Sequence, residues 1–103
     1  MLCTGSLFVK SISTLSKLEK LLVHENPGLT DASMVALPKL KKLKILYFWK
    51  NPGISNNSLP QMAKLKNLEN LEIDITGCTE EGARELKRRL KNCQVTFNYK
   101  KLD

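Results

Sequence analysis

Three segments of this chain repeat one pattern at a fixed spacing. Leu18, Leu43 and Leu68 each begin a Leu-x-x-Leu-x-apolar frame, and successive starts lie 25 residues apart (43 − 18 and 68 − 43). A repeat of this length predicts units that bury their apolar face only against their neighbours. The frame positions are Leu18, Leu21, Val23 and Asn26, then Leu43, Leu46, Phe48 and Asn51, then Leu68, Leu71, Ile73 and Thr76.

Each frame reads as a short strand followed by a turn. Leu21 and Val23 alternate with more polar neighbours, which is typical of a strand with one buried side. The spacing predicts parallel strands near 20–24, 45–49 and 70–74, joined by right-handed crossovers, and a last strand near 94–98. In Asn26-Pro27-Gly28 the proline disfavours helix before it and the glycine permits a positive φ.

A short helix is predicted after each turn. The first carries Met34 and Leu37 and is expected to stop at Pro38. The third contains no proline and is expected to be the longest. The N-cap candidates are Thr30 or Asp31 for the first helix, Ser58 rather than Ser55 for the second, which has Pro60 in its first turn, and Thr79 for the third.

The repeated frame resembles the leucine-rich repeat family, in its ribonuclease-inhibitor-like and cysteine-containing subtypes. The residues that carry the resemblance are Leu18-x-x-Leu21-x-Val23-x-x-Asn26-Pro27, Leu43-x-x-Leu46-x-Phe48-x-x-Asn51-Pro52 and Leu68-x-x-Leu71-x-Ile73-x-x-Thr76, with Thr76 departing from the usual Asn or Cys. The resemblance implies an α/β right-handed leucine-rich-repeat solenoid with a parallel β-sheet on its concave face and short helices on its convex face. It also implies that the concave face binds another protein.

The period divides the chain into one domain, 1–103. It consists of a partial repeat over 1–17, full repeats over 18–42, 43–67 and 68–92, and a C-terminal strand and tail over 93–103. Val95 and Phe97 come one residue earlier than the period requires. The partial first repeat indicates either an N-terminal cap or a piece of a longer repeat protein.

Composition points to a soluble domain inside the cell. No apolar run approaches the ~20 residues of a membrane span, and the start of the chain lacks the basic region of a signal peptide. Cys3 and Cys78 lie three units apart, beyond the ~7 Å reach of a disulfide. Reduced thiols favour an intracellular, cytoplasmic location.

The outward side of the predicted strands is the candidate binding surface. Tyr47 and Trp49 have no route to the core from a strand in this register, and such residues are enriched at interface hot spots. We expect a protein partner, with Trp49 as anchor and an acidic flank that selects basic groups. The candidate residues are Leu22, His24, Ile45, Tyr47, Trp49, Glu72 and Asp74. The alternatives are that the chain's own tail covers this surface, for example at Tyr99 or Leu2, or that a further strand pairs with the edge of the first.

Two columns of basic residues offer a different partner. They are Lys39, Lys64 and Arg89, and Lys41, Lys66 and Lys91, in a chain of net charge +7. Cations near helix C-termini offset the helix dipole, and a solvated stabilising role is the simplest interpretation. Docking to nucleic acid or to an anionic membrane is the alternative function, disfavoured because no aromatic residue interleaves the columns.

Catalysis has little support in the sequence. His24 is the only histidine, no cysteine and histidine set has metal spacing, and there is no glycine-rich phosphate loop. We therefore expect no enzyme activity, no cofactor, no metal and no small-molecule substrate.

Overall fold

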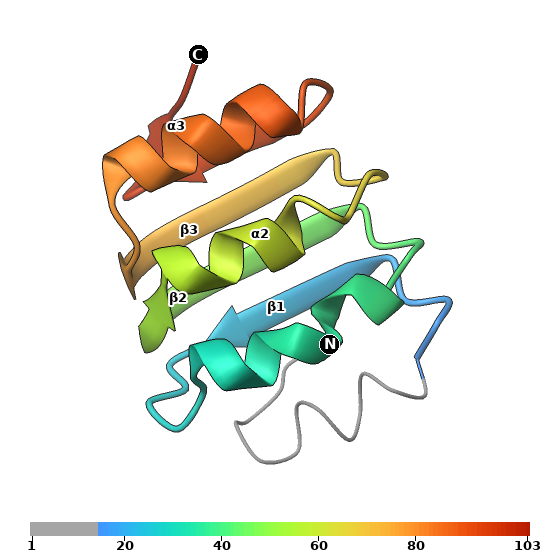
Figure 1. Ribbon diagram of the computed structural model, residues 1–103, viewed down its shortest axis with the longest axis horizontal. Helices are drawn as coiled ribbons and strands as arrows, with labels where there is room; N and C mark the ends of the chain where they lie inside the picture. Colours follow the sequence, from blue (N-terminus) through green and yellow to red (C-terminus); the bar gives the residue numbers. More distant parts are fainter. Residues whose placement is uncertain (1–14) are drawn as a thin grey trace.

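The computed structural model describes residues 15–103 as one five-stranded sheet covered on one side by helices (Figure 1). The strands lie in chain order across the sheet, β1-β2-β3-β4-β5. Their bounds are Lys20–His24 for β1, Ile45–Ser55 for β2, Asn70–Gly77 for β3, Gln94–Phe97 for β4 and Lys100–Lys101 for β5.

The first four strands pair in parallel, which confirms the predicted strand positions and directions. Leu21 lies opposite Leu46, and Leu46 opposite Leu71, so the 25-residue spacing becomes the sheet register. Leu71 lies opposite Val95, which confirms that the last strand comes one residue early.

The core lies between the inner face of the sheet and the helices. Alternate strand residues point into it, as the two-residue period of a strand requires. The apolar strand residues with no exposed surface are Leu21, Val23, Leu46, Phe48, Ile54, Leu71, Ile73 and Val95.

The helical layer packs against that inner face. It consists of the 3-10 helices η1 (Asp31–Lys39) and η2 (Asn56–Ser58) and the α-helices α2 (Leu59–Met62) and α3 (Glu80–Arg89). Figure 1 shows η1, α2 and α3 lying side by side in front of the strands. At 10 residues α3 is the longest of them, as predicted.

The first helix is a 3-10 helix because of how its apolar residues are spaced. Met34, Leu37 and Leu40 are buried at intervals of three, which a helix with three residues per turn places on one side. Pro38 lies inside this helix, which ends at Lys39. The prediction that Pro38 stops the helix is therefore wrong.

The predicted caps can be compared with the structure in three helices. Thr30 stands at the N-cap of η1, as predicted, and its backbone N–H donates to Ser33 Oγ at 3.5 Å. Thr79 Oγ1 accepts a hydrogen bond from Gly82 N at 3.1 Å, confirming the N-cap of α3. Ser58 precedes α2, but its hydroxyl donates to Asp31 and makes no capping bond. Ser55 caps η2 instead, with Oγ accepting from Asn57 N at 3.3 Å.

Asn51, inside β2, joins its repeat unit to the preceding one just past the end of β1. Its Nδ2 donates to Val23 O at 2.8 Å and to Trp49 O at 3.0 Å, while its Oδ1 accepts from Asn26 N at 3.2 Å. The predicted ladder of Asn26 and Asn51 is confirmed. Thr76 in the third unit makes only a local bond, accepting from Cys78 N at 3.1 Å.

Each of the first three repeat units has one left-handed residue that is not glycine: it directly follows β1 in the first unit and lies inside β2 and β3 in the next two. Glu25, Lys50 and Ile75 have φ of 49°, 58° and 55°. No glycine among the described residues has a positive φ, so that predicted role of Gly28 is wrong. Gly53 is required for a different reason, because a Cβ there would collide with the carbonyl oxygen of Leu29.

The predicted fold class needs correction, because the sheet is mixed. After β4 the chain reverses through Asn98 and Tyr99, with φ of 46° and 68°, and β5 pairs antiparallel with β4. Two residues of positive φ are the geometry of a tight hairpin, which turns the chain back. The molecule measures 34 × 26 × 19 Å, a block rather than an extended array. A mixed five-stranded sheet covered by one layer of short 3-10 and α-helices therefore replaces the predicted leucine-rich-repeat solenoid, whose sheet was expected to be purely parallel. The predictions for residues 1–14, including the partial repeat and Cys3, fall outside the described residues.

Candidate functional site: an aromatic concavity on the outer sheet face

The face of the sheet opposite the helices carries a concavity of about 410 Å³. We call this face the outer face. Residues from β1, β2 and β3 form the concavity, and Tyr99 contributes from the turn before β5. The lining residues are Leu22, Val23, His24, Tyr47, Trp49, Glu72, Asp74 and Tyr99.

The strand register brings together six of the seven residues predicted for partner binding. Leu22, Tyr47 and Glu72 lie side by side on adjacent strands. His24, Trp49 and Asp74 form the next row along the strands. The seventh residue, Ile45, lies outside the lining set near the start of β2.

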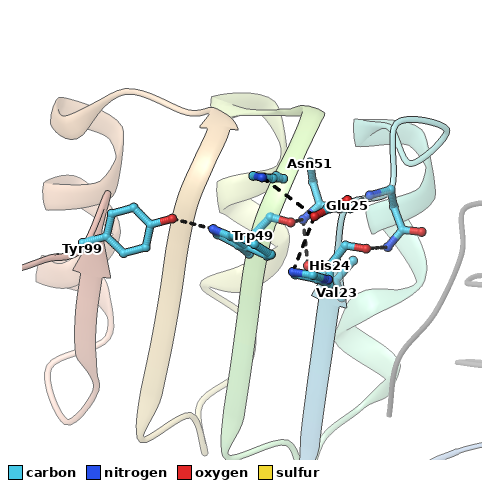
Figure 2. Close-up of polar contacts among 8 residues, drawn as sticks. Val23, His24, Glu25, Trp49, Asn51 and Tyr99 are labelled. Atoms are coloured by element: carbon cyan, nitrogen blue, oxygen red, sulfur yellow. Dashed lines mark hydrogen bonds and ion pairs between the residues drawn. The ribbon is translucent and has the colours of Figure 1, made fainter.

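Trp49 is held from several directions (Figure 2). Its ring stacks on the ring of His24, with centroids 3.9 Å apart and an angle of 16° between the planes. Its Nε1 donates to the hydroxyl of Tyr99 at 2.5 Å. The ammonium of Lys50 lies 4.6 Å from the ring centroid, within the range of a cation–π contact. Trp49 is therefore ordered by its own chain.

A charged cluster supports the Trp49 ring on the side of β1. Glu25 Oε1 lies 3.8 Å from Lys50 Nζ and 4.0 Å from His24 Nε2. All three side chains are about half exposed, so each ion pair contributes little to stability by itself. Their effect is to restrict the two groups that contact the indole.

Tyr99 closes one side of the concavity. Its backbone N–H donates to Asp74 Oδ1 at 2.9 Å, and Asp74 is only 2% exposed. Its own side chain stays 66% exposed. The alternative that the chain's tail covers this face is thus true in part: Tyr99 covers Asp74 and bonds to Trp49, but the concavity remains open.

Glu72 is the acid that stays available in the concavity. Burial, followed by the nearby charge of Asp74, raises the pKa of its carboxyl above the ordinary value of 4.5. No hydrogen bond or ion pair reaches its carboxylate from within residues 15–103. Its neighbours across the strands are Tyr47 and Thr96.

Sequence reasoning left Lys50 and Tyr99 out of the predicted site. Lys50 follows the strand pattern, but its left-handed φ returns its ammonium over Trp49, which an ideal strand would not do. Tyr99 was considered only as a cover. Asn98 directly before it, between the alternating Gln94–Phe97 and two lysines, is the one hairpin signal available.

Other candidate groups lie away from this concavity. The two basic columns are fully on the surface, and none of their six members pairs with an acid inside the described range. Lys66, Arg89 and Lys91 share a shallow hollow of about 300 Å³.

The two cysteines of the described chain are poor nucleophiles. Cys78 and Cys93 are both free and buried. Burial raises the pKa of Cys78, against a smaller opposing effect of the Thr76 hydrogen bond. Burial also raises the pKa of Cys93, to about 11, despite Lys87 nearby. Thiols that stay protonated react slowly.

Residues 15–103 contain no cluster of three potential metal ligands. Over the same range, no helix has the length and apolar character that crossing a membrane requires.

The sequence matches no protein-family model and no curated protein. One solved structure with a similar fold is described as "Structure of Chaetomium Mex67:Mtr2 subunits". A chain of it is 16% identical with a TM-score of 0.64, and the alignment covers 99% of this chain and 80% of that one. At this identity the likeness concerns the fold alone.

The comparison also corrects the family expected from the sequence. Assignment to the leucine-rich repeats, whether ribonuclease-inhibitor-like or cysteine-containing, finds no support in any family match. The supported description is a mixed sheet with helices on one face, shared with a chain of the Mex67:Mtr2 structure.

Proposed function

We propose that this chain is a binding module without catalytic activity, and that it holds a protein partner in the concavity of its outer face. One observation carries the proposal. An ordered tryptophan stands in an open hollow of about 410 Å³, on the side of the sheet that the helices leave uncovered.

The physical argument begins with the side chains. Tyr47 and Trp49 offer large contact areas with few rotatable bonds, so little conformational entropy is lost when a partner binds. His24 and Tyr99 already fix Trp49, which lowers that cost further. Leu22 and Tyr47 add apolar surface beside it.

The similar solved structure is in line with this proposal at a coarse level. Its description names subunits, and therefore a protein that assembles with another. The finer statement, that Leu22, Tyr47, Trp49 and Glu72 contact the partner, is our own.

Site-directed photo-crosslinking tests the proposal. A photoreactive phenylalanine analogue replaces Tyr47 in one variant and Val35 in the other. Val35 is a matched control because it is 64% exposed in η1, in the helical layer on the other side of the sheet. We expect the residue 47 variant to form a discrete adduct in extract from the native source and the residue 35 variant to form none.

The captured protein is then purified and titrated against wild type and Tyr47→Ala. A hot-spot residue is expected to cost tenfold or more in affinity, about 1.4 kcal/mol. Crosslinking from residue 35 alone, or equal affinity of the two proteins, would overturn the proposal.

A second function is favoured by the hollow that Lys66, Arg89 and Lys91 share. These groups are suited to phosphates of nucleic acid or lipid headgroups. Titration with a fluorescent single-stranded oligonucleotide and with anionic vesicles at rising salt separates the two functions. Phosphate contacts lose affinity steeply with salt, whereas an apolar anchor does not.

A further inference from the structure

We propose that the concavity seats a cationic side chain of the partner, lysine or arginine, with its charge on Glu72 and its methylene groups against Leu22 and Tyr47. This inference rests on the proposed function, because it names the group that the partner inserts.

The first step is the state of Glu72. It lies half-buried among aromatic and aliphatic side chains, and the described part of the chain supplies it with no donor. A carboxylate in such surroundings has lost water without gaining a partner. A cation entering the hollow restores what the carboxylate has lost.

The second step is the competition among acids. Asp74 is already satisfied by the backbone of Tyr99 and is almost fully covered. Glu25 already faces Lys50 and His24. Glu72 is therefore the acid of this face that an incoming charge meets.

The third step is the shape of the ligand. Lysine and arginine carry apolar stems that pack on aromatic and aliphatic surface while the charged end reaches an acid. The chain shows the same chemistry internally, since the Lys50 ammonium lies over the Trp49 ring. An acidic group would instead face the charges of Glu72 and Asp74, and a neutral aliphatic chain would leave Glu72 without a partner.

Trp49 provides a direct readout, because it is the only tryptophan in the chain. Its fluorescence is followed during titration with the peptide acetyl-Gly-Gly-X-Gly-Gly-amide, where X is arginine, lysine, norleucine or glutamate. Norleucine matches the lysine stem without its charge. Each titration is repeated with Glu72→Gln and with Glu81→Gln, an exposed acid on α3 that gives the same change in net charge.

We expect the arginine and lysine peptides to bind more tightly than norleucine, and glutamate to bind most weakly. Glu72→Gln is expected to weaken the arginine peptide about fivefold or more and to remove its advantage over norleucine. Glu81→Gln is expected to change it less than about twofold, which screening by solvent allows for an exposed charge. Circular dichroism confirms that both variants fold.

The inference is overturned if norleucine binds as tightly as lysine, if Glu72→Gln has no more effect than Glu81→Gln, or if no cationic peptide alters Trp49 fluorescence. These failures leave the proposed function standing provided Tyr47→Ala still weakens the crosslinked partner. The proposed function itself fails if Tyr47→Ala binds that partner with the same affinity as wild type.

Discussion

The two faces of β2 differ in the contacts that hold their side chains. On the inner face, Leu46 and Phe48 have no exposed surface and belong to the hydrophobic core. On the outer face, Tyr47 and Trp49 stay partly open to solvent, and the Trp49 ring is held by stacking on His24 and one hydrogen bond to Tyr99. Neighbouring residues of one strand thus have different surroundings, and we assign folding to the inner ones and propose recognition for the outer ones.

The outer side of the sheet also contains features that cost stability. Ile75 is a β-branched residue with φ of 55°, a conformation that its Cβ disfavours. Tyr99 occupies a hairpin position that usually requires glycine. The Glu72 carboxylate has no hydrogen bond or ion pair within residues 15–103. Among the inner-face residues that the structure describes, none has a positive φ and no buried side-chain polar atom lacks a hydrogen bond, which supports a separate use for the outer face.

The largest expected effect is on the inner face. Leu46→Ala is expected to lower the free energy of unfolding by about 2–5 kcal/mol. The Leu46 side chain is packed by the repeat units on both sides, so truncating it leaves a cavity in the core. Tyr47→Ala is the matched control and is expected to cost less than about 1 kcal/mol. Urea denaturation measures both. Equal shifts in midpoint would mean that the two faces do not divide the tasks.

Asn51 lies further along the same strand, where it bonds to the neighbouring repeat unit. Asn51→Ala removes the acceptor for Asn26 N and the donor to two carbonyls in a fully buried site. We expect a loss of about 1–3 kcal/mol, the usual penalty for buried groups left without partners. Thr76→Ala, at the equivalent position of the next unit, removes one local bond and serves as the control. A loss as large for Thr76→Ala would show that the bridge between units is unimportant.

Much of the sheet was predictable because its signal is repeated. The spacing of Leu21, Leu46 and Leu71 fixes both the strand positions and their register, since a slip of one residue would expose every core side chain. The same register placed six of the seven predicted site residues around one hollow. The structure agrees with the predicted positions of these residues, and their role in binding a partner stays a prediction.

The features that the sequence did not predict depend on local backbone geometry. This geometry occurs only once in the chain, or its residues lack the usual sequence signal for it. The antiparallel β5 follows from the Asn98-Tyr99 hairpin, which lacks the usual glycine. The 3-10 form of η1 follows from apolar spacing of three that also fits an α-helix. Resemblance in the repeated frame therefore led to the wrong family and to a purely parallel sheet.

Replacing Ile75 is expected to have a smaller effect than the changes above, and to stabilise the fold rather than destabilise it. Ile75→Asn is expected to raise the free energy of unfolding by about 0.5–1 kcal/mol, since asparagine tolerates the left-handed conformation and the isoleucine side chain is 47% exposed. Val35→Asn, exposed in η1, is the control and is expected not to stabilise. A lower urea midpoint for Ile75→Asn would show that the isoleucine packs against something the fold needs.

The smallest effect concerns Glu72 and depends on pH. The pKa of this carboxyl is raised in the folded chain, so the folded state binds its proton more tightly than the unfolded state does. Its contribution to stability is present in acid and is lost as the pH rises through and above 4.5. Glu72→Gln is therefore expected to melt at a slightly higher temperature than wild type near neutral pH, with the difference closing in acid.

Asp31 provides the opposite case on the helical side. Burial alone would raise its pKa, but hydrogen bonds from the hydroxyl and backbone of Ser55 and from Ser58 outweigh it and lower the pKa. Asp31→Asn is expected to melt below wild type at neutral pH, with the difference shrinking as the pH falls through 3.8, because wild type then loses the stabilising charge. Melting curves of the three proteins across this range compare the two acids directly. If Glu72→Gln, like Asp31→Asn, melted below wild type at neutral pH, the charged Glu72 carboxylate would already be stabilised within the folded chain. The hollow would then have no need of a cation.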